Sequence, residues 1–112
     1  MKEIKAFIHR NRAAEVLRAL KTAGFERFSF NDVKGSLMAL DPEDRAFSVE
    51  FGEEVTSEVK IEFVCNDDRV HEAIDLLEEY GRTNQPVSGW VFVTTLDDMH
   101  VIRGSGDDAS SA

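Results

Sequence analysis

Apolar residues recur with two different spacings along the chain, and these spacings define the expected elements. Residues 2–9 alternate apolar and polar side chains, which predicts a strand with one buried face. The apolar residues of the next segment are three and four positions apart, as on one face of a helix: Ala13, Val16, Leu17 and Leu20. We expect Asn11 to cap this helix and Gly24 to end it in the left-handed conformation.

The alternating pattern then returns and predicts further strands. Residues 25–33 predict a second strand, and residues 58–64 predict a third, with Lys60 and Glu62 on the face opposite its apolar residues. A fourth strand follows much later, around Val91 and Val93.

A second helix is expected between the third and fourth strands. Asp67 or Asp68 is suited to cap it, and Gly81 marks its end. Its apolar stripe again has helical spacing: Val70, Ala73, Ile74 and Leu77.

The order βαββαβ is typical of the ferredoxin-like α+β fold, in which two helices cover one face of an antiparallel sheet. We expect residues 1–103 to form a single domain of this kind, ending in a short strand at residues 99–103. Residues 104–112 have the composition of a flexible acidic tail.

The sheet face away from the helices should carry Phe7, Val64, Trp90 and Phe92. This set is too apolar to stay in water as one patch, which favours packing on further copies of the chain. Alternatively, the long loop covers these side chains in a monomer.

The connection between the second and third strands, residues 34–54, is unusually long for a compact domain, and such loops are usually functional or disordered. Residues 41–44 predict a turn within it. A short hairpin could form through Phe47, Val49 and Phe51, which are the predicted apolar contacts with a partner.

Composition narrows the functional classes. A net charge of −9 argues against nucleic acid or an anionic membrane as the partner. No apolar run approaches the roughly 18 residues of a membrane span. The single cysteine, Cys65, cannot form an internal disulfide, so we expect a cytoplasmic protein in which Cys65 is a small buried residue.

The sequence contains no motif for nucleophilic catalysis or phosphate transfer, and we expect no enzymatic activity. His9, His71, His100 and Cys65 lack the spacing of a metal motif, so no metal site is predicted. A small enzyme that uses Glu62 or Asp68 stays open as a further hypothesis.

In register along nearly the whole chain, the sequence resembles the PII signalling family. The matching marks are Val33-Lys34-Gly35, Val59-Lys60-Ile61-Glu62, Asp67-Asp68, Thr83, Gly89, Phe92-Val93 and Arg103. The resemblance implies a trimer that binds ATP or ADP in clefts between subunits. It also implies that 2-oxoglutarate is sensed through a magnesium ion, and that the long loop contacts transporters and enzymes.

The family pattern assigns ligand contacts to particular positions. Gly35 matches the point where the base of the long loop approaches the nucleotide. The positions that line the base and ribose are occupied by Ser29, Glu62 and Val64.

The far wall and the phosphates involve the second half of the chain. Gly89 and Phe92 match the far wall, and Arg103 matches one phosphate-binding arginine. Lys34 is a second candidate cation, and Trp90 could provide a packing surface for the ligand.

Several family residues are replaced here. Gln85 and Trp90 stand in place of lysines, and Val101 in place of an arginine. Ala39 replaces the glutamine that helps relatives to hold magnesium. Glu58 replaces the lysine that pairs with 2-oxoglutarate in the family. The loss of these groups predicts that magnesium ATP with 2-oxoglutarate is not the ligand set.

The resemblance as a whole implies a homotrimeric regulator without a permanent cofactor. We expect it to sense AMP or ADP and to regulate a transporter or an enzyme through the long loop. Phe51 stands where some relatives carry a modified tyrosine, and it lacks the hydroxyl that this modification needs. The alternative is a nucleotide-independent or metal-responsive trimeric adaptor.

Overall fold

The computed structural model describes residues 1–36, 45–48 and 53–106, with backbone only for 45–48 and for 53–54. Along the chain the main elements are β1 Lys2–His9, α1 Ala13–Thr22, β2 Ser29–Gly35, β3 Arg45–Ser48, β4 Glu53–Cys65, α2 Val70–Gly81 and β5 Gly89–Thr95. Short 3₁₀ turns, Arg10–Arg12 and Asp67–Arg69, precede the two helices.

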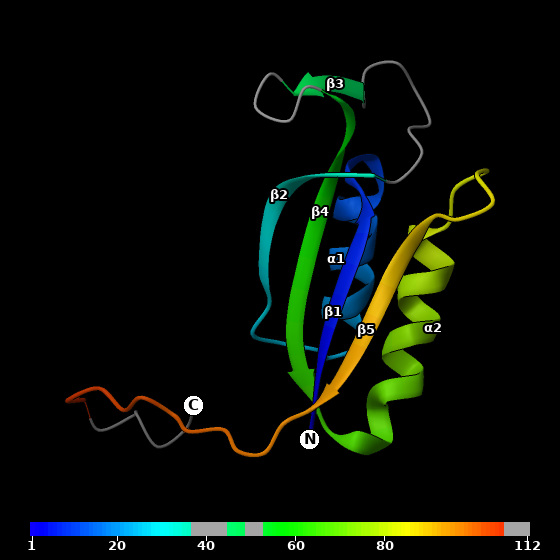
Figure 1. The fold of residues 1–112 in the computed structure, drawn as a ribbon. Helices are drawn as coiled ribbons and strands as arrows, with labels where there is room; N and C mark the ends of the chain where they lie inside the picture. The colour runs from blue at the N-terminus through cyan, green and yellow to red at the C-terminus, as the bar shows by residue number, and fades with distance from the viewer. Residues whose placement is uncertain (37–44, 49–52, 107–112) are drawn as a thin grey trace.

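The strands form one antiparallel sheet in the order β2-β4-β1-β5, and β3 pairs with the beginning of β4. Both helices lie against the same face of this sheet (Figure 1). The predicted ferredoxin-like α+β fold is therefore confirmed.

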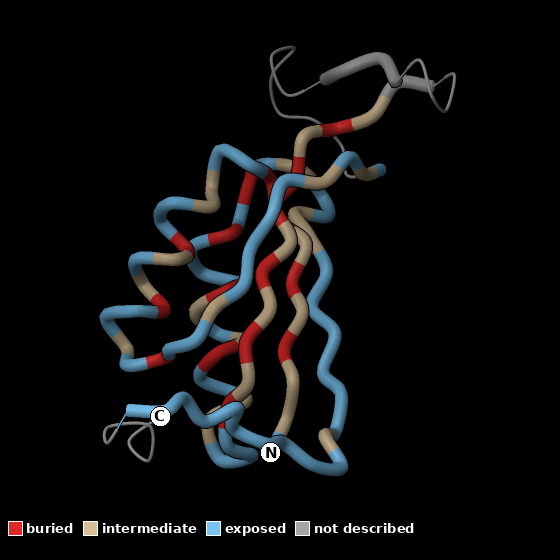
Figure 2. The backbone as a smooth tube through the Cα atoms, turned by 90° about the vertical axis from the view of Figure 1, so that its left-hand side faces the viewer, coloured by how far each residue is buried: buried red, intermediate tan, exposed pale blue. Residues whose placement is uncertain are grey.

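The core lies between the helices and the sheet, where buried residues from both layers meet (Figure 2). Alternate residues of β1 and β4 point into it, because strand side chains alternate between the two faces. They pack against the predicted helical stripes, of which Val16, Leu20, Ala73 and Leu77 are buried. Cys65 is also buried, as predicted. No described helix is long and apolar enough to cross a membrane.

The predicted helix caps are wrong, although Gly24 ends the first helical segment with a φ of 91° as expected. Asn11 lies inside a 3₁₀ turn, and Arg12 occupies the cap position of α1. Asp67 and Asp68 likewise lie inside the turn before α2. The extra turns satisfy backbone groups that a side-chain cap would otherwise satisfy.

Two strand predictions also need correction. The second strand begins at Ser29, not at residue 25, because Arg27 adopts a left-handed φ of 62° that interrupts extended backbone. Residues 99–103 form no strand. They are exposed, Ile102 to 98%, and pair with no strand in the part of the chain that the structure describes.

The long connection is shorter than predicted, because β4 begins at Glu53 and β2 continues to Gly35. β3 includes Phe47, one of the three residues of the predicted hairpin, and pairs with the beginning of β4. Val49 and Phe51, the other predicted partner contacts, lie outside the described residues.

Candidate functional site

The sheet face opposite the helices carries the predicted aromatic patch. Phe7 lies opposite Trp90 across the β1–β5 ladder, and Val64 lies opposite Glu3 across the β1–β4 ladder. Phe7 and Phe92 pack edge to face with ring centroids 6.1 Å apart. Trp90 is 56% exposed and Phe92 53% exposed, so a large apolar surface faces solvent in the isolated chain.

A row of residues across this open face contains several of the predicted ligand contacts. Ser29 lies opposite Glu62, Glu62 lies opposite Lys5, and Lys5 lies opposite Phe92. The carboxylate of Glu62 lies 3.3 Å from the ammonium of Lys60 on the same strand. This ion pair joins two residues of the same strand, β4, and not residues of neighbouring strands.

The base of the long loop is built on a buried carboxylate. Glu58 is 3% exposed, and its Oε2 accepts a hydrogen bond of 2.7 Å from the Thr56 hydroxyl. The same hydroxyl lies 3.2 Å from the carbonyl oxygen of Gly35. A Cβ at Gly35 would fall 2.1 Å from Glu58 Oε1, so a side chain at this position would displace the Glu58 carboxylate. We refer to Gly35, Thr56 and Glu58 as the loop-base cluster.

His9 lies next to this cluster at the end of β1. It is opposite Glu58 across the β1–β4 ladder and is fully buried. Among the described residues, neither of its ring nitrogens finds a hydrogen-bond partner. Buried polar atoms are nearly always hydrogen-bonded, so an orphaned imidazole calls for an explanation.

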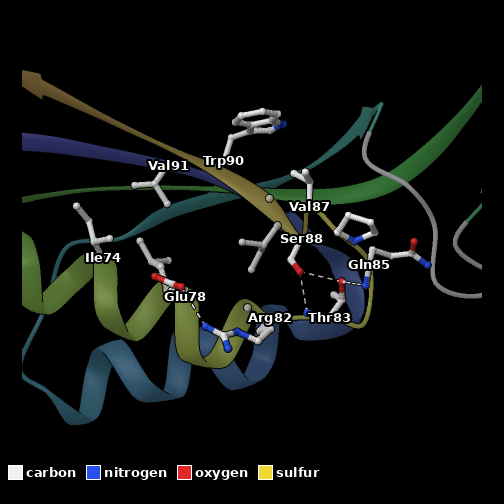
Figure 3. A pocket seen from close by; sticks show the side chains of 14 residues that line it. Ile74, Glu78, Arg82, Thr83, Gln85, Val87, Ser88, Trp90 and Val91 are labelled. Carbon is white, nitrogen blue, oxygen red and sulfur yellow. Dashed lines mark hydrogen bonds and ion pairs between the residues drawn. The ribbon is translucent and has the colours of Figure 1, made fainter.

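The loop from Arg82 to Ser88 closes on itself (Figure 3). The Ser88 hydroxyl accepts a hydrogen bond of 2.8 Å from the backbone N–H of Thr83, and the two hydroxyls lie 2.9 Å apart. The N–H of Gln85 donates to the Thr83 hydroxyl at 3.1 Å. Pro86 has no N–H. These backbone groups are therefore not available to an anion.

A cavity of about 480 Å³ lies between this loop, the end of α2 and the start of β5. Its floor is apolar, with Ile74, Leu77 and Gly81 from α2, and Trp90 lies at its rim (Figure 3). Gly89 is required where β5 begins, because a Cβ there would fall 2.3 Å from the carbonyl oxygen of Phe7.

The remaining predicted contacts are spread over the chain. Gly35 and Gly89 lie at the end of the sheet where β1 finishes, because Gly89 pairs with Ile8. Arg103 lies in the exposed segment that follows the opposite end of β5 (Figure 1). Lys34 is exposed near the end of β2. One chain therefore does not bring Arg103 to the two glycines.

Two of the described titratable groups have clearly shifted pKa values. Burial raises the pKa of the Cys65 thiol, which keeps it protonated and unreactive near neutral pH. A hydrogen bond from the N-terminal ammonium lowers the pKa of Asp67, and the two groups lie 2.6 Å apart. Among the described residues, no three His, Cys, Asp or Glu side chains converge as a metal site.

Sequence reasoning missed the burial of His9 and the hydrogen bonds of the loop after α2. The alternation in β1 places His9 on the open face, so nothing in the sequence indicates that it is covered. The loop did carry a signal, because Thr83 and Ser88 flank a proline and can bond to nearby backbone groups.

Comparison with known proteins gives a consistent result. The family model described as "Nitrogen regulatory protein P-II" matches residues 1–106. A nitrogen regulatory protein P-II of Bradyrhizobium diazoefficiens is 31% identical over 111 residues, covering 97% of this chain and 99% of that protein. The protein of the same name from Synechocystis is 27% identical, covering 99% of each chain. The chain therefore belongs to the P-II nitrogen regulatory protein family.

Proposed function

We propose that the protein is a non-enzymatic cytoplasmic regulator that works as a homotrimer. A small effector, an adenine nucleotide such as AMP or ADP, binds in clefts between subunits. Effector binding then controls how the long connection between β2 and β4, residues 36–52, contacts a transporter or an enzyme. Membership of the P-II family supports a regulatory role.

The placement of the predicted ligand contacts is the observation that carries this proposal. Gly35 and Gly89 lie at one end of the sheet, and Arg103 follows the other end of β5. A site that uses all three needs an Arg103 from another copy. The exposed aromatic face gives a reason for copies to associate, since an apolar surface of this kind is normally covered.

The charge of the site limits the effector. The chain carries a net charge of −9, and Lys34 and Arg103 are the candidate cations for phosphate. Two N–H groups of the loop after α2 already donate within the loop, to Ser88 and to Thr83. With two candidate cations in a chain of this negative charge, we expect a nucleotide of lower charge than ATP.

The buried Glu58 argues against a dicarboxylate such as 2-oxoglutarate at the base of the loop. Relatives carry at this position a lysine that pairs with 2-oxoglutarate, and Glu58 offers such a ligand no positive charge. We therefore do not expect magnesium ATP with 2-oxoglutarate to act as the effector.

Nucleotide binding can be tested by thermal shift and calorimetry with AMP, ADP and magnesium ATP, each with and without 2-oxoglutarate. A ligand at a hundredfold excess over its Kd should add about 2.7 kcal/mol to the free energy of unfolding. We expect AMP or ADP to stabilise the protein. The effect should disappear in Arg103→Ala and persist in Arg18→Ala, which removes the same charge from the exposed surface of α1.

Stabilisation that survives in Arg103→Ala would contradict the proposed phosphate contact. If no nucleotide stabilises the wild type, the protein is instead a nucleotide-independent adaptor. The internally bonded loop after α2 favours that second function.

Trp90 reports on the trimer, because it is the single tryptophan and is half exposed in the isolated chain. Sedimentation should give a mass of three chains, and Trp90 emission should shift to the red on dilution to monomer. A monomeric protein at micromolar concentration would refute this part of the proposal.

A further inference from the structure

A cavity of about 470 Å³ lies between α1 and the beginning of β2, at the edge of the sheet opposite β5. Two cations line it, Lys21 from α1 and Arg27 from the segment before β2. Its apolar lining comes from one leucine and three phenylalanines: Leu17, Phe25, Phe28 and Phe30. The cavity thus combines an aromatic surface with positive charge.

The core holds two of these aromatic rings in place. Phe25 and Phe28 both pack edge to face on the buried Phe63, with ring centroids 5.5 Å and 5.1 Å away. Phe30 lies opposite Ile61, a fully buried residue of β4, so its side chain is on the helix-facing side of the sheet. Phe30 is nevertheless 61% exposed. One aromatic wall is therefore fixed, and a further ring is uncovered beside it.

The two cations have no side-chain partner in the part of the chain that the structure describes. Neither the Lys21 ammonium nor the Arg27 guanidinium makes an ion pair or a hydrogen bond there. Other arginines of this acidic chain pair with carboxylates: Arg10, Arg12, Arg69 and Arg82. Glu26 also lines the cavity and offsets one of the two positive charges. The side chains of the cavity therefore carry an excess of one positive charge.

Arg27 occupies its place at a conformational cost. Its φ is 62°, and it is the single non-glycine residue with a positive φ among those described. Glycine adopts this region without strain, whereas a residue with a Cβ does so at a cost. Such strained residues cluster at ligand sites. A glycine would make the same turn more easily, so the turn by itself does not explain the guanidinium.

We propose that this cavity binds an organic monoanion with a flat aromatic body, such as an aromatic carboxylate. The ring of the ligand packs on Phe28 and Phe30. Its carboxylate accepts hydrogen bonds from Lys21 and Arg27, of which the guanidinium is suited to a bidentate contact. Glu26 repels a second negative group, which selects against dicarboxylates and phosphate esters.

This site is separate from the proposed nucleotide site. Ser29 and Glu62 are paired across the β2–β4 ladder, and each is the chain neighbour of a residue of the pair Phe30 and Ile61. Because strand side chains alternate between the two faces, Ser29 and Glu62 lie on the open face, away from the cavity. The inference therefore does not depend on nucleotide binding.

Calorimetric titration of the full-length chain with 2-naphthoate tests the site. We expect one molecule per chain, with binding about tenfold weaker in Arg27→Gly and in Lys21→Gln, because each variant removes a charged hydrogen-bond donor. Arg27→Gly also relieves the strained backbone, so the fold is retained. Arg18→Gln is the matched control, since Arg18 is exposed on the same helix and lies outside the cavity.

The wild-type chain provides a second test that needs no variant. 2-Naphthylmethanol has the same ring system without the charge and should bind about tenfold more weakly than 2-naphthoate. Amide NMR should place the shifts caused by 2-naphthoate in α1 and residues 25–30. Equal binding of the two probes, undiminished binding in both Arg27→Gly and Lys21→Gln, or shifts centred on β5 would overturn the proposal.

Discussion

Replacing Gly35 with alanine tests whether the loop-base cluster is as tightly packed as the structure indicates. The new Cβ would fall 2.1 Å from Glu58 Oε1 and 2.2 Å from Glu58 Cδ, far inside van der Waals contact. The carboxylate must therefore move away from Thr56 and lose its 2.7 Å hydrogen bond. A hydrogen bond to a charged group contributes about 1.5–3 kcal/mol, so we expect a loss of roughly 2 kcal/mol in the free energy of unfolding.

Urea denaturation at a fixed protein concentration measures this loss, because the stability of an oligomer depends on concentration. A double-mutant cycle with Glu58→Ala isolates the clash: without the carboxylate, Gly35→Ala should cost less than about 0.5 kcal/mol. Gly104→Ala is the matched control, since a Cβ there meets no atom within 4 Å. An equal cost of Gly35→Ala with and without Glu58 would refute the reasoning.

Three further predictions concern the fold and its loops. Thr83→Val keeps the side-chain shape but removes the hydroxyl that bonds Ser88 and Gln85. The free energy of unfolding should fall by about 1–2 kcal/mol, and proteolysis of the loop should become faster. Unchanged values would mean that these bonds are not formed. Leu20→Ala should cost about 2–5 kcal/mol in denaturant, because Leu20 is fully buried, and clearly more than Leu17→Ala at a partly buried position. Because burial raises the pKa of Cys65, the folded chain keeps its thiol proton where the unfolded chain loses it. Stability should therefore fall as the pH rises above about 8.5, and a fall of the same size in Cys65→Ala would contradict this assignment.

Periodicity predicted the elements whose two faces differ strongly. The stripe that includes Val16 and Leu20, and the alternation of Ile4, Ala6 and Ile8, each identify a buried face. Burial of apolar area outweighs other local preferences at such positions, so the pattern alone was sufficient. Residues 99–103 show the opposite case. Their pattern resembles a strand, but a strand also needs a neighbour, and in this structure they have none.

The candidate site was predictable only in part. Family resemblance directed attention to Gly35 and Gly89, and the structure gives the steric reason at each: Glu58 beside Gly35, and the Phe7 carbonyl beside Gly89. The roles of the predicted ligand contacts stay predictions. The burial of His9 could not have been recognised, because the alternation of β1 places this residue on the open face of the sheet.

The sequence by itself determined the order of strands and helices, the apolar faces and the excess of negative charge, since these depend on local spacing and composition. The tertiary structure decided which polar groups meet. Strand register placed His9 opposite Glu58, and it placed Ser29, Glu62, Lys5 and Phe92 in one row. Register sets such neighbours through hydrogen bonds between strands that are distant in the chain, so no local pattern contains them.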